Sequence, residues 1–380
     1  MPGAPLFVHI GLQKTGTSYL QSIFWQNLDA LREQGLDMVP PSKRETFWLM
    51  LRVRNRYNPE FDPDNVGEAL QRLPRQLAEA TAPRALISEE SLAPASADQI
   101  RELLEACGDR EVHVVLTVRD LARQVPSAWQ QNLQSGAEET FEDYLRRLRK
   151  TEGRSKVLLW RNKDVVAVLE RWREQVPAER IHVVTVPPSG SDPEQLLHRF
   201  CEVIGVDAQR LDREVARSNS GLRHVHAEVM RRVNAHLDDS HRRRDVYGDI
   251  GKRYLAVQVL GDGGGERVRM PRELQPWCTE VSQRYVDHIA AGGYQVVGDL
   301  DDLLPTDAGF VDEVCEPSEQ EVADASSAAL AAVLTDQMDR LRARRSQQAP
   351  QAAEAPAPVS LGRRVVRRVA REARAGLRRD

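Results

Sequence analysis

Residues 6–18 read LFVHIGLQKTGTS. The first five residues form a short apolar run, which predicts a buried β-strand. The next eight, from Gly11 to Ser18, hold two glycines, one lysine and three hydroxyl side chains. Apolar residues then recur at helical spacing over residues 19–34, and Gly35 is a typical helix stop. This order of strand, glycine-rich loop and helix is typical of the start of a nucleotide-binding α/β fold.

The same alternation continues along the chain. Short apolar runs at 85–88, 112–118 and 181–186 predict three further strands, and helical spacing precedes two of them, at 66–80 and 163–175. The run VHVVLTV at 112–118 is nearly continuous, which is typical of a central parallel strand buried on both faces. We therefore expect a three-layer α/β fold of the P-loop type, with a central parallel sheet flanked by helices.

The C-terminal part of the chain differs in pattern and charge. Helical spacing over 193–204, 222–237 and 274–291 predicts a helical region after the last strand. We place the α/β domain at residues 1–305 and an acidic-to-basic helical extension at 306–346. Residues 347–380 are expected to form a disordered linker and a basic amphipathic tail. Residues 340–380 carry twelve Arg and three acids, a net charge of +9 in a chain whose net charge is −4.

Composition excludes several classes of protein. Aromatic residues make up 5% of the chain, too few for stacking platforms that bind single-stranded nucleic acid. No apolar run approaches the ~18 residues of a membrane span, and the first residues lack the pattern of a secretory signal. The four cysteines are far apart and have no zinc spacing, which favours a reduced cytoplasmic setting without structural metal.

The sequence of the basic tail fits more than one kind of partner. It is suited to an anionic membrane surface, to nucleic acid, to the acidic stretch 299–324, or to no partner at all. We expect a cytoplasmic protein, membrane-peripheral at most, and predict no specific nucleic-acid partner. The oligomeric state is not predicted.

The glycine-rich loop has the composition of a phosphate site. Its backbone N–H groups, its hydroxyl side chains and the positive end of the following helix can all bind an anion. Gly11 and Gly16 have the separation of the GxxxxGK[ST] motif, but Thr17 stands where that motif has lysine, and Lys14 lies inside the loop instead. This departure argues against hydrolysis of ATP or GTP. The alternative is a tight turn with no ligand.

A second group of polar residues follows the strand at 112–118. Arg119 comes directly after this strand, at the edge of the sheet where ligands bind, and Ser127 lies eight residues further on. A guanidinium and a hydroxyl can together clamp a second phosphate. Taken alone, this spacing is a weak signal.

Together the two groups resemble motifs of the sulfotransferase family. KTGTS at 14–18 resembles the family's 5′-phosphosulfate loop, and Arg119 with Ser127 resembles its 3′-phosphate motif. Residues 181–205 are similar to a later strand and helix of bacterial members, so that the resemblance extends from residue 6 to about residue 305. Members bind 3′-phosphoadenosine 5′-phosphosulfate and transfer its sulfuryl group to a hydroxyl or an amine.

The resemblance implies a set of site residues. Lys14 would stabilise the leaving oxygen without a metal, and Glu90, or alternatively Glu89, would be the general base after the strand at 85–88. Residues 217–222 resemble the family's late cofactor-covering loop. The product would be adenosine 3′,5′-bisphosphate. The predicted donor-binding residues are Gln13, Lys14, Thr15, Gly16, Thr17, Ser18, Arg119, Ser127 and Arg217.

Other interpretations stay open. Either glutamate is also favoured as an acid at a helix N-terminus, and His9, within a strand, is expected to be a packed core residue. For the whole chain, the alternatives are a P-loop nucleotide or small-molecule kinase and a non-catalytic nucleotide-binding module. The kinase would need a lysine after Gly16. A small molecule, a glycan and a lipid all remain candidates for the acceptor.

Overall fold

A computed structural model describes residues 3–154, 157–214, 221–261 and 263–348. The chain divides into two units, Met1–Ser326 and Ser327–Asp380, and the site described below lies in the first. The predicted ligand Arg217 and the basic tail from residue 349 onward lie outside the described residues. No helix in the described ranges is long and apolar enough to cross a membrane.

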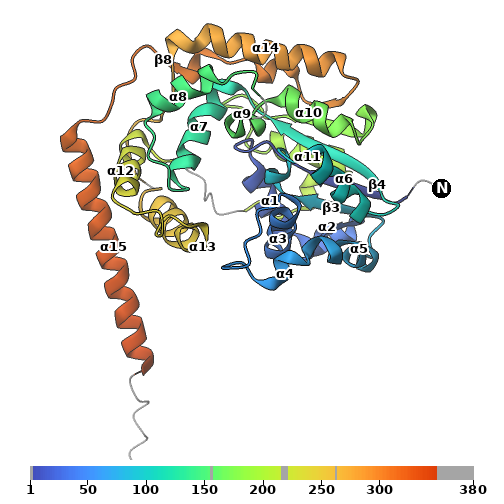
Figure 1. The fold of residues 1–380 in the computed structure, drawn as a ribbon, viewed down its shortest axis with the longest axis horizontal. Helices are drawn as coiled ribbons and strands as arrows, with labels where there is room; N and C mark the ends of the chain where they lie inside the picture. The colour runs from blue at the N-terminus through green and yellow to red at the C-terminus, as the bar shows by residue number, and fades with distance from the viewer. Residues whose placement is uncertain (1–2, 155–156, 215–220, 262, 349–380) are drawn as a thin grey trace, which may run out of the picture. The chain divides into compact units, whose positions relative to one another are not determined.

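Six strands of the described chain form one sheet in the order β2-β3-β1-β4-β5-β7, and every neighbouring pair is parallel. The predicted α/β architecture with a central parallel sheet is confirmed, and helices lie on both sides of the sheet (Figure 1). β2 and β7 were not predicted, because edge strands of three residues are too short to show an apolar pattern. The strands are β1 (Pro5–His9), β2 (Leu36–Met38), β3 (Arg84–Ser88), β4 (Glu111–Val118), β5 (Ile181–Thr185) and β7 (Gln295–Val297).

Both faces of the sheet are buried. On one face, Phe7, Leu86 and Val115 belong to a core cluster with apolar residues of α1 (Thr17–Gln26), α2 (Leu28–Glu33) and α11 (Gln195–Ile204). On the other face, Val8 and Val114 have no exposed surface. This double burial explains why β4 reads as a nearly continuous apolar run.

His9 ties three neighbouring strands together in the core. Its Nδ1 is hydrogen-bonded to Ser88 Oγ of β3 at 2.8 Å, and its Nε2 lies 3.4 Å from Thr117 Oγ1 of β4. The ring packs edge-on against Phe200, with centroids 4.7 Å apart. Burial lowers the pKa of His9 to about 3, so the imidazole is neutral. The expectation of a packed core histidine is confirmed.

Two helices that the sequence predicts as continuous are divided in the structure, one of them at a long-range contact. The helix expected over 19–34 is α1 and α2, separated at Asn27. The Asn27 amide donates to Ile23 O at 2.9 Å and to Asp212 O at 2.8 Å, and its Oδ1 accepts from Asp212 N–H at 2.7 Å. The helix expected over 66–80 is similarly divided into α4 (Asp64–Gly67) and α5 (Ala69–Glu79).

The remaining helices and strands of the described chain have the following bounds. The further α-helices are α3 (Lys43–Val53), α6 (Ala97–Ala106), α7 (Leu121–Leu133), α8 (Phe141–Lys150), α9 (Leu158–Arg161), α10 (Val165–Arg173), α12 (His224–Ala235), α13 (Arg244–Tyr247), α14 (Gln275–Ala291) and α15 (Glu319–Gln348). The short 3₁₀-helices are η1 (Glu90–Leu92), η2 (Ala178–Arg180), η3 (Ala208–Arg210), η5 (Arg272–Leu274), η6 (Leu300–Leu303) and η7 (Asp307–Gly309). A π-helix, η4 (Gly248–Val259), follows α13, and β6 (Met270–Pro271) pairs with β8 (Phe310–Val311).

A buried ion pair closes the carboxyl end of β5. Arg199 of α11 donates to Asp302 Oδ2 at 2.5 Å and to Thr185 O at 2.9 Å. The Thr185 hydroxyl also donates to Asp302 Oδ2, at 2.8 Å. A Cβ at Gly298 would lie 2.1 Å from Thr185 Oγ1, so glycine is needed where the chain passes this group. The pair joins α11, β5 and η6.

We predict that Asp302→Ala destabilises the protein by about 3 kcal/mol, because the buried Arg199 guanidinium loses its only carboxylate among the described residues. The measurement is the free energy of unfolding from urea titration followed by circular dichroism. Asp301→Ala, at the exposed neighbouring position, is the matched control and is expected to change stability by less than about 0.5 kcal/mol. Equal losses in the two variants would contradict the structural role of the pair.

Candidate functional site

The loop between β1 and α1 has a backbone conformation that opens it to an anion. Gly11 (φ 73°), Lys14 (φ 66°) and Gly16 (φ 85°) all lie in the left-handed region. A Cβ at Gly11 would lie 2.9 Å from the Cα of Glu90, so glycine allows the residues after β3 to approach the loop closely. Gly16 begins α1, and no side chain caps this helix. The first N–H groups of α1 are therefore available to a phosphate.

Hydrogen bonds to β4 hold the loop in place. The Leu12 N–H donates to Thr117 O at 2.8 Å. The Thr15 hydroxyl donates to Leu12 O and is 2.6 Å from Thr117 Oγ1. Because Thr15 has no exposed surface, its hydroxyl anchors the loop from inside, which corrects the expectation that all the loop hydroxyls face the ligand. Gln13 likewise accepts hydrogen bonds from two side-chain amides, one of them in α7, and so supports the loop.

A cavity of about 310 Å³ lies beside the loop at the carboxyl edge of the sheet. The structure brings seven predicted residues to this cavity, which will be called the transfer cavity: Lys14, Gly16, Thr17, Ser18, Glu90, Arg119 and Ser127. Several further residues that no sequence motif indicates also line the cavity, namely Tyr19, Gln130, Gln131, Gln134 and Lys252. Glu89 is not among the lining residues.

Of the two candidate bases, Glu90 faces the transfer cavity. Its buried Oε2 has no hydrogen-bond partner among the described residues. Burial raises the pKa of Glu90, and the positive charges of Lys14 and Lys252 oppose this rise. Glu89 instead accepts a hydrogen bond from the Ser91 N–H at 3.1 Å. Burial, followed by the negative charge of Glu90, raises the pKa of Glu89 to about 7. A buried, unpartnered carboxylate at a cavity has the properties of a proton acceptor.

Two buried cations lie beside this carboxylate. Burial lowers the pKa of Lys14; Glu90 opposes this effect, while Lys252 and Arg119 add to it. Burial also lowers the pKa of Arg119 to about 10. Arg119 Nη1 donates to Lys14 O at 3.2 Å, but its buried Nε has no partner in the described chain. A partly buried guanidinium whose Nε has no hydrogen-bond partner is costly unless an anion binds there.

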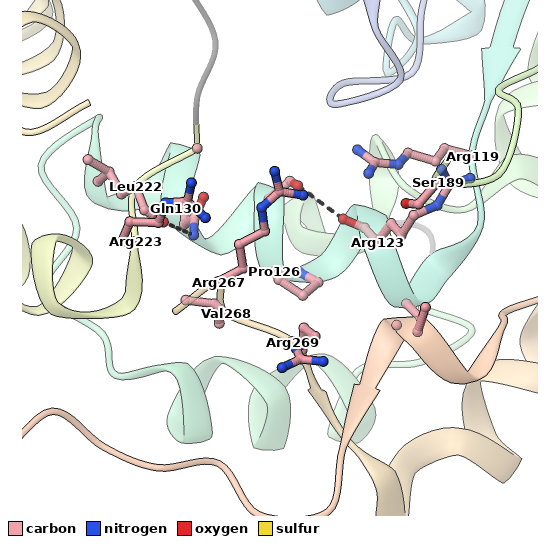
Figure 2. A pocket seen from close by; sticks show the side chains of 15 residues that line it. Arg119, Arg123, Pro126, Gln130, Ser189, Leu222, Arg223, Arg267, Val268 and Arg269 are labelled. Carbon is pink, nitrogen blue, oxygen red and sulfur yellow. Dashed lines mark hydrogen bonds between the residues drawn. The ribbon is translucent and has the colours of Figure 1, made fainter. Parts of the chain in front are cut away.

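A second cavity of about 310 Å³ adjoins the transfer cavity and shares Arg119, Ser127, Gln130 and Gly221 with it. We call it the arginine cavity. Figure 2 shows Arg119 and Arg123 on one side, Arg223 on the other, and the Arg267 side chain extending between them. The arginines that line it are Arg119, Arg123, Arg223, Arg267 and Arg269. Its apolar walls are formed by Ala122, Pro126, Leu222, Val268 and Ala308.

Segments far apart in the chain build the arginine cavity. Arg223 and Arg267 form an isolated antiparallel bridge, which places the two arginines side by side. Gln130 of α7 donates to Leu222 O at 2.7 Å and holds this bridge against the helix. The buried Nε of Arg223, like that of Arg119, has no partner among the described residues. Two guanidiniums are therefore available to an anion.

The arginine of α7, Arg123, is already neutralised. Arg123 is ion-paired with Asp120 and donates to Pro187 O at 2.8 Å. It braces the junction between β5 and α7. Ser127 lies in the middle of α7, where its hydroxyl donates to Arg123 O at 3.0 Å.

One signal could have revealed part of the arginine cavity. In ERVRM at 266–270, the exposed Arg267 and Arg269 alternate with the buried Val268 and Met270. This two-residue period indicates an extended segment with both arginines on one face. No local pattern indicates that this face turns toward Arg119.

Comparison with known proteins adds little to this geometry. No family model and no curated protein matches the chain. A crystal structure of a sulfotransferase from Alicyclobacillus acidocaldarius is similar to it over 63% of this chain and 99% of that chain, with 17% sequence identity and a TM-score of 0.35. At this identity and score, the likeness shows neither a shared family nor a shared activity. In the described ranges, no group of three or more His, Cys, Asp or Glu side chains is arranged to hold a metal ion.

The raised pKa of Glu89 predicts a pH-dependent stability. Because the folded protein binds this proton more tightly than the unfolded chain, stability is lost as the pH rises from the ordinary glutamate pKa of 4.5 through about 7, with a slope of at most about 1.4 kcal/mol per pH unit. Glu89→Gln removes the titration. Urea titrations are expected to show that the free energy of unfolding of Glu89→Gln, relative to that of the wild type, increases between pH 4.5 and 8.

The matched control for this measurement is Glu105→Gln, at an exposed position on α6. Its stability relative to the wild type is expected to stay constant over the same pH range. A constant difference for Glu89→Gln as well would show that the Glu89 carboxyl group titrates as it does in water.

Proposed function

We propose that this protein is a sulfotransferase that moves the sulfuryl group of 3′-phosphoadenosine 5′-phosphosulfate to the hydroxyl group of an acceptor. The observation that carries the proposal is the pair of adjoining cavities that share Arg119 and Ser127. Each cavity contains a separate anion site, and the two sites differ in construction. A nucleotide with anionic groups at both its 5′ and 3′ positions matches this arrangement.

The residues present fit such a donor. The 5′-phosphosulfate would bind to the N–H groups of the loop at 11–18 and of the first turn of α1. The 3′-phosphate would bind between Arg119 and the Arg223–Arg267 bridge, where two buried Nε atoms have no described partner. The apolar walls of the arginine cavity, which include Pro126 and Leu222, suit an adenine ring.

The same residues support a direct transfer. The acceptor oxygen attacks sulfur, the bond from sulfur to the bridging phosphate oxygen breaks, and the acceptor proton passes to Glu90. The products are a sulfate ester and adenosine 3′,5′-bisphosphate. Lys14 stabilises the negative charge that builds on the phosphate oxygen as it leaves. The unpartnered Oε2 of Glu90 supports its role as the base.

The arginine cavity argues against the kinase alternative. A kinase of the P-loop type needs a lysine directly after Gly16, and this chain has Thr17 there. Such a kinase needs no anion site other than the phosphate loop, so it does not explain the group formed by Arg119, Arg223 and Arg267. A non-catalytic nucleotide-binding module would use both cavities, but it would have no need for a carboxylate buried at the transfer cavity.

Adenosine 3′,5′-bisphosphate is expected to raise the melting temperature of the protein, and EDTA is expected to leave this shift unchanged. Arg119→Ala should weaken bisphosphate binding about tenfold or more, the loss typical of a charge-assisted hydrogen bond to phosphate. Arg75→Ala, at an exposed position on α5, is the control. Stabilisation by Mg²⁺-ATP but not by the bisphosphate would support the kinase and reject the proposal.

Lys14→Ala and Glu90→Gln are expected to lower turnover about 100-fold or more while bisphosphate binding stays within about twofold, because both residues act mainly in the transition state. The assay incubates the sulfur-labelled donor with cell extract and measures label transferred to acceptors, which also identifies the acceptor. If Glu90→Gln keeps full turnover, the base is Glu89 or another residue. If Lys14→Ala loses only affinity and not turnover, Lys14 has no catalytic role.

A further inference from the structure

The transfer cavity has a second lysine that no sequence motif indicates. Of the six lysines in the chain, Lys14 and Lys252 line this cavity, although they lie far apart in the sequence. Lys14 comes from the loop after β1, whereas Lys252 comes from the π-helix η4. π-Helices are rare, and they occur frequently at functional sites.

The two lysines and Glu90 line the cavity without neutralising one another. Neither ammonium group forms an ion pair with a carboxylate of the described residues, although the positive charge of Lys252 acts on Lys14, Glu89 and Glu90. Charges of opposite sign that share a cavity without pairing leave room for a charged ligand between them. Because Lys14, Glu90 and Arg119 are only partly exposed, the charge of that ligand is best balanced by groups that line the cavity.

The charge of the proposed donor shows what Lys252 adds. A phosphosulfate group carries two negative charges, and Glu90 in its basic form adds a third. Arg119 is assigned to the 3′-phosphate, and Lys14 is assigned to the phosphate oxygen that leaves. Lys252 is the remaining cation among the described residues that line the cavity, and it comes from the C-terminal helical region.

We propose that Lys252 binds the oxygens of the transferring sulfuryl group, while Lys14 stabilises the phosphate oxygen that leaves. This inference rests on the proposed function and extends it by a residue that contacts the group in transfer. A cation aimed at the sulfuryl oxygens stabilises them as the sulfur–oxygen bond to phosphate breaks, and it offsets the repulsion between the sulfuryl group and Glu90.

Close packing fixes the position of Lys252. A Cβ at its neighbour Gly251 would lie 2.5 Å from Cζ of Tyr247, so glycine is required for η4 to pack on that ring. The Tyr247 hydroxyl in turn donates to Asn234 of α12, and Asn234 donates to Leu133 O at 2.8 Å, at the end of α7. The lysine is thus held relative to α7, the helix that contributes Ser127 to the cavity.

A second contact holds the segment that precedes η4. Arg244 of α13 donates two hydrogen bonds to the Asp62 carboxylate, at 2.8 and 2.7 Å. Its guanidinium also lies over the rings of Phe47 and Phe61, 5.8 and 5.4 Å from their centroids. The helical region is thereby attached to the segment between α3 and α4. Both contacts hold α13, which leads directly into η4, and they limit movement of the backbone that carries Lys252.

The test compares binding of the intact donor with binding of the bisphosphate product, which lacks the sulfuryl group. By calorimetry, Lys252→Met is expected to weaken binding of 3′-phosphoadenosine 5′-phosphosulfate about tenfold, the loss of one charge-assisted hydrogen bond, and to leave bisphosphate binding within about twofold. Lys252→Arg should recover part of the donor affinity. Lys150→Met, at an exposed lysine on α8, is the control and should bind both ligands as the wild type does.

The outcomes separate this inference from the proposed function. Wild-type protein that binds neither ligand would reject the proposed function, and the inference with it. Wild-type binding of both ligands, with equal donor affinity in Lys252→Met, would overturn the role of Lys252 alone. An equal loss of donor and bisphosphate binding in Lys252→Met would also overturn it, since the lysine would then act on the nucleotide and not on the sulfuryl group.

Discussion

The parallel pairing of β1 with β4 is the constraint on which the candidate site depends. Because the two strands run in register, the loop after β1 and Arg119 after β4 leave the sheet side by side. Thr117, near the end of β4, then binds both the Leu12 N–H and the Thr15 hydroxyl, and Arg119 donates to Lys14 O. Backbone groups that face an anion are thus held by the buried core and need no flexible side chain to position them.

The two cavities keep charged groups buried without protein partners. Arg119 Nε, Arg223 Nε and Glu90 Oε2 are all of this kind in the described chain. Native proteins pair nearly all such groups, because an unpaired one loses its hydration and gains nothing in return. Three such groups at one pair of adjoining cavities indicate a ligand with charge at two places, and the packed sheet beneath supplies the stability that such a site lacks.

Much of the framework could be predicted from the sequence, because buried parallel strands have a strong local pattern. β1, β3, β4 and β5 were all found in this way, as were the loop and Arg119 at strand ends. The misses have physical causes. β2 and β7 are too short to show a period, and the helix break at Asn27 results from its hydrogen bonds to Asp212, a contact across some 185 residues.

The order of strand, loop and helix was determined by the sequence itself, since apolar spacing and glycine placement act over a few residues. Only the tertiary structure decided which polar groups face the cavities. It turned the Thr15 hydroxyl inward and Glu90 toward the transfer cavity, and it brought Lys252 to that cavity and Arg223 to the adjoining one. These outcomes depend on close approach between segments far apart in the chain, and a local pattern contains no information about which distant segment will pack against it.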